Sequence, residues 1–145
     1  MTPIETLVRD LADRAELTEL LARQSRWLDD RAADRTGEVF TDDAVARTPG
    51  GEVSGAAAVA ELALGRHREY ERTIHATHSV AVELAGDEAV VECGVKAVFV
   101  LRDREAVQFV DARYRFDARR TERGWRFASI AVTPLARTGD VARHR

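Results

Sequence analysis

The chain has almost no cysteine and no long hydrophobic run, and these two absences exclude several classes of protein. Cys93 is the only cysteine, so the sequence can form neither an intramolecular disulfide nor a cluster of thiolate metal ligands, a usage typical of a reducing compartment. No apolar run approaches the length of a membrane span, and the first residues lack the basic and apolar regions of a signal peptide. We therefore expect a cytoplasmic protein with no membrane partner.

A glycine-rich phosphate-binding loop is also missing, and the net charge is small. Residues 49–51, Pro-Gly-Gly, indicate a turn rather than a nucleotide loop. A formal net charge of −3 does not favour nucleic acid. His75, His78 and Asp29 have a spacing that gives only a weak signal for a metal site. The sequence thus predicts no cofactor, no metal and no nucleic-acid partner. One basic cluster, interpreted as a solvated hairpin tip, consists of Arg119, Arg120, Arg123 and Arg126.

The length is that of one domain. A chain of 145 residues can bury about two thirds of the surface that its unfolded form would expose, so it needs no disulfide or metal to fold. We assign residues 1–136 to this single domain and expect residues 137–145 to form a disordered tail.

The first part of the chain has apolar residues at helical spacing. Residues 4–11 predict a short first helix, and Asp13 followed by Glu16 resembles a capping box that opens a second helix. The apolar stripe of this second helix is interrupted at Gln24, whose amide needs hydrogen-bond partners in a neighbouring element or in a cavity. Asp29 follows at the end of the helix, where the helix dipole does not favour a carboxylate.

The second half changes from helical spacing to alternation. A third helix is predicted over residues 56–72, capped by Ser54, and we interpret its charged face, which includes His67, as solvated. From residue 79 onward the period of two predicts strands joined by tight turns, which makes consecutive strands antiparallel neighbours. The chain is therefore expected to be an α+β domain. The predicted strands span residues 79–84, 89–101, 106–119 and 125–135.

Two histidines just before the first of these strands are the candidate proton-transfer residues. His75 and His78 carry the side chain whose unperturbed pKa lies nearest neutrality. On a strand they have opposite parity, so both cannot face one cavity unless a bulge intervenes, and we favour His75 as the inward residue. A histidine at such a position can also be a hydrogen-bonded structural residue. Cys93 shares its face with aliphatic residues and is interpreted as a small buried residue rather than a nucleophile.

Four strings, in their order and spacing, resemble the SnoaL-like branch of the nuclear-transport-factor-2-like superfamily. They are LLARQSRWLD at residues 20–29, FTDDA at 40–44, TIHATHSVAVE at 73–83 and RYRFDARRTERGWR at 113–126. The resemblance implies a cone: a strongly curved antiparallel sheet wrapped around N-terminal helices, with a deep apolar cavity. It also implies subunits that associate through the sheet, and the apolar strand faces and outward charges are compatible with a homodimer or a homotrimer alike.

The resemblance further implies a lyase, isomerase or cyclase activity. In scytalone dehydratase and hexachlorocyclohexane dehydrochlorinase, a histidine oriented by an aspartate acts on a substrate in the cavity, and aligning the third string places these residues at His75 and Asp29. The aspartate would fix the imidazole tautomer and stabilise the imidazolium. The expected substrate contacts are Gln24, Trp27, His78, Tyr114, Val110, Ala112, Phe116 and Ile130.

Two positions depart from the relatives. Gln24 stands where several of them carry a tyrosine or lysine, and Ile130 stands where the dehydrochlorinase-like members carry an arginine. Halide elimination is therefore not expected, whereas dehydration, isomerisation or cyclisation of a small, largely apolar, polyketide-like molecule fits better. Because a fold does not dictate a function, the alternative is a non-catalytic module of the same fold that binds a small apolar ligand or a protein partner.

Overall fold

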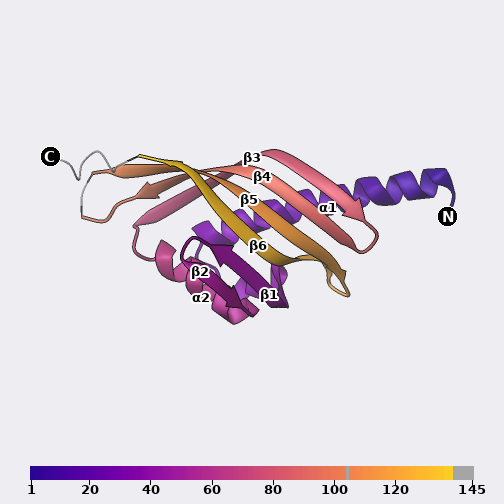
Figure 1. Cartoon of the computed structure of the whole chain (residues 1–145), viewed down its shortest axis with the longest axis horizontal. Helices are drawn as coiled ribbons and strands as arrows, with labels where there is room; N and C mark the ends of the chain where they lie inside the picture. The colour runs from indigo at the N-terminus through magenta and orange to yellow at the C-terminus, as the bar shows by residue number, and fades with distance from the viewer. Residues whose placement is uncertain (104, 139–145) are drawn as a thin grey trace.

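The computed structural model describes residues 1–103 and 105–138, which form helices packed against one curved six-stranded sheet (Figure 1). This is the α+β architecture that the sequence predicts. In chain order the elements are α1 (Pro3–Asp29), the short 3-10 helix η1 (Ala33–Glu38), β1 (Phe40–Thr48), β2 (Gly51–Ser54), α2 (Ala56–His67), β3 (Arg72–Ala85), β4 (Glu88–Val100), β5 (Val107–Thr121) and β6 (Gly124–Arg137).

The N-terminal region is one helix, not the two that the sequence predicts. Thr2 caps it, because its side chain accepts from the backbone N–H of Glu5 at 3.1 Å while the Glu5 carboxylate accepts from the Thr2 N–H at 2.9 Å. Pro3 occupies the first helical turn, where its missing N–H costs nothing. The first turns project beyond the sheet (Figure 1), and Ile4 and Leu7 are accordingly exposed.

Asp13 lies inside this helix and joins it to the last hairpin. Its carboxylate accepts two hydrogen bonds from Arg120, both at 2.8 Å, and one from the Trp125 indole at 3.0 Å. Arg120 also stacks over the Trp125 ring at 4.7 Å and bonds Asp87 at 2.8 Å. The predicted capping role of Asp13 is therefore wrong, because its oxygens accept hydrogen bonds from residues far along the chain. Arg120 likewise does not belong to a solvated hairpin tip.

The sheet has the strand order β2-β1-β6-β5-β4-β3. Strands β3 to β6 form the predicted antiparallel meander. Strand β1, however, pairs with β6 in parallel, so the sheet is not antiparallel throughout. The short strand β2, which alternation did not reveal, returns antiparallel to β1 after the turn at residues 49–51.

Helix α2 is shorter than predicted, and β3 is longer. The helix ends at His67. Its N-cap is Gly55, which has no side chain to offer a hydrogen bond, so Ser54 does not cap the helix. Strand β3 already starts at Arg72. The alternation was hidden there because the inward residues, Thr73 and His75, are polar. Both functional histidine candidates near residue 75 are consequently strand residues.

The core lies between the two helices and the concave face of the sheet. Phe116 stacks on Phe127 with ring centroids 4.0 Å apart, at the centre of this core. Neither helix is long and apolar enough to cross a membrane, in the part of the chain that the structure describes. Arg137 still belongs to β6, and the Thr138 N–H donates to the Phe109 carbonyl at 3.0 Å, so the predicted disordered tail does not start at residue 137. Residues 139–145 lie outside the described part.

Candidate active site

A cavity of about 330 Å³ opens between α1, α2 and the concave face of the sheet. Its size is at the lower end of the range of small-molecule sites, and most of its wall is apolar. Of the residues that the sequence predicts for the site, those that line it are Gln24, Trp27, His75, Val110, Ala112, Tyr114 and Ile130.

Two predicted contact residues lie elsewhere. His78 is exposed, with its ring over Gly94 of the neighbouring strand and its Nδ1 3.0 Å from the Ser79 hydroxyl. A bulge follows directly, since Ser79 has a φ of 51° and the pairing register shifts between His78 and Ala81. Phe116 points into the core instead of the cavity and is completely buried. Neither side chain can touch a molecule in this cavity.

Asp29 and His75 are in direct contact, as the sequence predicts. The last residue of α1 brings the Asp29 carboxylate to β3, where it accepts from the His75 ring Nδ1 at 2.6 Å, the His75 backbone N–H at 2.9 Å and the Thr73 hydroxyl at 3.0 Å. The His75 side chain is only 2% exposed, whereas that of Asp29 is 23% exposed. Because Nδ1 donates to the carboxylate, neutral His75 carries its lone pair on Nε2, the nitrogen available to the cavity.

A third histidine, which the sequence did not indicate as a functional residue, completes the site. His67, in the last turn of α2, lies with its Nε2 3.3 Å from the His75 Nε2, and its Nδ1 donates to the Ala63 carbonyl at 2.6 Å. The interpretation of His67 as a solvated residue is therefore wrong. Burial lowers the pKa of His67 below its ordinary value, although the bond to Ala63 acts in the opposite direction. Helical spacing could have revealed it, because His67 follows Val59 and Ala63 at intervals of four on the buried face of α2.

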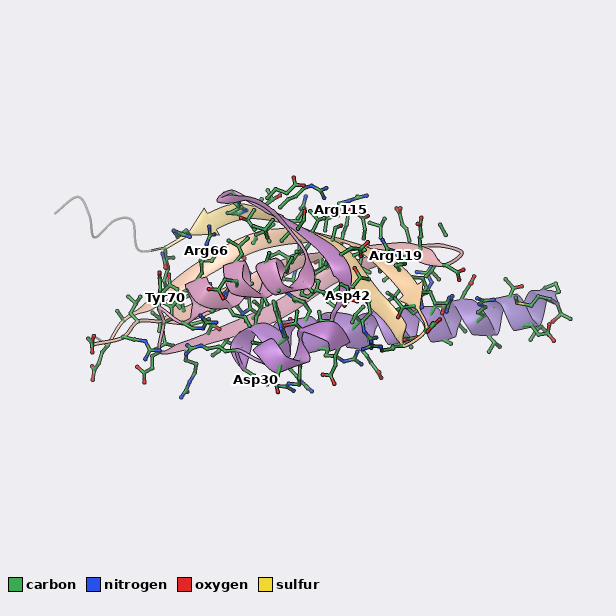
Figure 2. All side chains as sticks on the ribbon, turned by 90° about the horizontal axis from the view of Figure 1, so that it is seen from below. Asp30, Asp42, Arg66, Tyr70, Arg115 and Arg119 are labelled. Atoms are coloured by element: carbon green, nitrogen blue, oxygen red, sulfur yellow. The ribbon has the colours of Figure 1, made fainter. Side chains whose placement is uncertain are left out.

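Aromatic rings cover the two histidines. The Phe99 centroid lies 5.7 Å from that of His67 and 5.9 Å from that of His75, and Tyr70 packs on Phe99 at 4.7 Å. Tyr70 and Arg66 lie together at the end of α2, away from the projecting N-terminal part of α1 (Figure 2). The imidazoles thus lie beside aromatic rings in a partly buried recess, where electrostatic interactions are stronger than in water.

Two further polar groups face the cavity from its walls. Gln24 is 1% exposed, and neither atom of its amide has a hydrogen-bond partner among the described residues. Tyr114 lies on the opposite wall, on β5. Burial raises the pKa of Tyr114 above its ordinary value, so its hydroxyl stays protonated and can donate. An amide and a phenol in these positions can orient a bound molecule through its oxygen atoms.

Charge along the cavity wall is of one sign. Among the described lining residues there is no aspartate or glutamate, while Arg66 and Arg137 line the cavity and are exposed, which places them at its opening. The side chain of Arg66 lies against Gly50, where a Cβ would collide with the guanidinium. In the part of the chain that the structure describes, no three His, Cys, Asp or Glu side chains converge as they would around a metal ion.

Comparison with solved structures identifies the fold. An NTF2-like protein with a cystatin-like fold from Novosphingobium aromaticivorans superposes with a TM-score of 0.83 at 26% identity, covering 99% of this chain and 95% of that one. A candidate scytalone dehydratase from the same organism gives 0.81 at 16% identity, covering 89% and 88%. A hexachlorocyclohexane dehydrochlorinase from Novosphingobium barchaimii gives 0.79 at 20% identity, covering 90% and 92%.

The sequence itself matches no curated protein. The sequence profile of the SnoaL-like domain, in contrast, matches residues 9–131, which include most of α1, the whole of α2 and most of the sheet. Both the histidine of β3 and the carboxylate at the end of α1 lie within the matched region. The chain belongs to the SnoaL-like family of the nuclear-transport-factor-2-like superfamily.

Proposed function

We propose that the protein is a cofactor-independent lyase, isomerase or cyclase in which His75 removes a proton from a small molecule bound in the cavity. The observation that carries this proposal is the 2.6 Å contact between His75 Nδ1 and Asp29, which leaves Nε2 unprotonated on a ring that lines the cavity, 3.3 Å from the Nε2 of His67. A general base requires that state.

Asp29 supports proton transfer in two ways. Its three accepted hydrogen bonds hold the carboxylate and the ring in one orientation, so that the tautomer with Nδ1–H is the stable one. When Nε2 takes up a proton, the negative charge beside the ring stabilises the imidazolium. A base positioned in this manner typically accelerates a reaction by about 10²–10⁴.

The cavity favours a largely apolar ligand that is neutral or anionic. Its walls are mainly apolar, no carboxylate is present among the described lining residues to meet a cation, and Arg66 and Arg137 stand at the opening. Gln24 and Tyr114 can bind a carbonyl or enolate oxygen, which increases in negative charge as the proton leaves the neighbouring carbon. Ile130 supplies an apolar wall at its own position, where a side chain cannot pair with a leaving halide, so we favour loss of water or migration of a double bond.

The test uses a β-hydroxytetralone, a bicyclic ketone that becomes a fluorescent naphthol when it loses water. We expect the wild type to accelerate this elimination and His75→Gln to lose most of the acceleration while still binding the ketone in calorimetry. His78→Gln is the matched control, because it removes an exposed histidine of the same strand.

The same assay separates catalysis from binding. If the wild type binds the β-hydroxytetralone and close bicyclic analogues but accelerates no reaction of any of them, the proposal of catalysis is contradicted. The protein would then be a module that binds small apolar molecules, which is the alternative that the sequence leaves open.

A further inference from the structure

Two imidazole nitrogens face each other in the cavity, and the surrounding hydrogen-bond acceptors determine which nitrogen of each ring carries a hydrogen. A carbonyl oxygen can only accept, so the 2.6 Å contact with Ala63 requires a proton on His67 Nδ1. The Asp29 carboxylate requires a proton on His75 Nδ1 in the same way. A neutral imidazole has a single N–H, so both Nε2 atoms carry lone pairs, 3.3 Å apart. At this distance, a proton taken up by one Nε2 can form a hydrogen bond to the other.

We propose that His67 is a second catalytic residue, which receives through Nε2 the proton that His75 removes and delivers it to a leaving hydroxyl of the same substrate. This inference rests on the proposed function. It identifies the residue that protonates the leaving hydroxyl, a step that His75 alone does not explain. His67 meets the geometric requirement, since it lines the same cavity as His75 and its Nε2 is in contact with the base.

The steps balance without an external proton. His75 Nε2 takes the proton from the carbon next to the carbonyl, and the electrons of the broken C–H bond form an enolate. The proton then crosses from His75 Nε2 to His67 Nε2. As the enolate collapses to a carbon–carbon double bond, the C–O bond at the β-carbon breaks and the departing oxygen takes the proton from His67, so that water leaves. Both rings end in the neutral state in which they began.

The charges around the two rings favour His75 as the base and His67 as the acid. Asp29 contacts His75 and stabilises a positive charge there. Among the residues that the structure describes, His67 has no carboxylate in direct contact; the charged groups that act on it are Asp29, His75 when protonated, and Arg31. Burial lowers the pKa of His67 below its ordinary value, which favours the neutral ring at rest and makes the protonated ring a better proton donor.

The arrangement also predicts stereochemistry. Nitrogens 3.3 Å apart, with Phe99 packed beside both rings, can reach a hydrogen and a hydroxyl on neighbouring carbons only from one face of the substrate. The elimination is therefore expected to be syn.

The experiment follows two reactions of the same proteins. The first is exchange of the α-hydrogen of tetralone with solvent deuterium, which requires only His75. The second is the elimination from β-hydroxytetralone, which requires delivery of a proton to the hydroxyl. We expect His67→Gln to lower elimination by about 10²–10⁴, the typical contribution of one acid or base, and to lower exchange far less. His75→Gln should lower both, and His78→Gln should lower neither.

The outcomes separate the two proposals. No exchange by the wild type contradicts the proposed function and this inference with it. Exchange and elimination by the wild type, with elimination by His67→Gln at the wild-type rate, overturns the role of His67 alone, because His75 then returns the proton itself. An equal loss of both reactions in His67→Gln also overturns it, because His67 then only supports His75.

Nitrogen NMR of the histidine rings gives a readout that does not depend on turnover. We expect the Nδ1–H tautomer for His67 and His75, and a single protonation event that shifts the Nε2 resonances of both rings together. If His67 instead carries its proton on Nε2, or if the two rings titrate independently, the proposed transfer of the proton is contradicted.

Discussion

Replacing Asp29 with asparagine tests how the carboxylate controls the tautomer of His75. The carboxylate accepts from three donors, namely the His75 ring, the His75 backbone N–H and the Thr73 hydroxyl. An amide has one oxygen and one NH₂ group. In Asp29→Asn the NH₂ group must therefore face at least one of these donors.

The three donors differ in how they can respond. The backbone N–H of His75 cannot give up its proton, and the Thr73 hydroxyl can only rotate. The His75 ring can move its proton from Nδ1 to Nε2 and then accept from the NH₂ group. We expect this tautomer to dominate in Asp29→Asn, so that the nitrogen facing the cavity is no longer a base and turnover falls by about 10²–10⁴. A donor left unpaired costs about 1–3 kcal/mol, so we expect the free energy of unfolding to fall by no more than this amount.

The assay is nitrogen NMR of labelled histidine at a pH above the titration of the rings, together with unfolding in urea. Asp30→Asn is the matched control, because this neighbouring carboxylate is exposed and, within the described part of the chain, pairs with Arg35 alone, at 3.3 Å. The control should keep the wild-type tautomer and stability. If Asp29→Asn keeps Nδ1–H on His75 and full turnover, the assigned role of Asp29 is refuted.

Three further predictions concern the rest of the cavity and core. Asp13→Ala leaves Arg120 without its buried partner and should lower the free energy of unfolding by about 3 kcal/mol at neutral pH. Because the hydrogen bond from Arg120 lowers the pKa of Asp13 below 3.8, this difference should persist above that value and shrink as the pH falls through the lowered pKa, in urea unfolding at each pH. Gln24→Leu removes a buried amide without partners among the described residues, so it should leave stability unchanged or raised by up to about 1 kcal/mol while weakening ketone binding in calorimetry. Burial raises the pKa of Cys93 to about 11, so iodoacetamide should label this thiol only after unfolding; rapid labelling of the folded protein would contradict its burial.

The sequence predicts best what depends on local periodicity. The four long strands and their antiparallel order follow from alternation and tight turns, and the contact between Asp29 and His75 follows from the resemblance to the SnoaL-like family. Cys93 is buried as its aliphatic neighbours indicate.

What the sequence did not reveal depends on partners distant in the chain. Asp13 has the spacing of a helix cap, but its partner Arg120 is 107 residues away. Strand β1 pairs in parallel with β6, and no local pattern selects that neighbour. His67 lies in a run of charged residues, which obscures its position on the buried face of α2. Its contact with His75 also depends on β3 starting at Arg72, earlier than alternation predicts.

The most direct test of the account is whether the protein exchanges the α-hydrogen of tetralone for solvent deuterium. This measurement requires only binding and removal of a proton, so it depends on neither a leaving group nor His67. We expect the wild type to exchange this hydrogen faster than buffer and His75→Gln not to do so, although both bind the ketone. Binding by the wild type with exchange no faster than in buffer would contradict the central claim that His75 is a base.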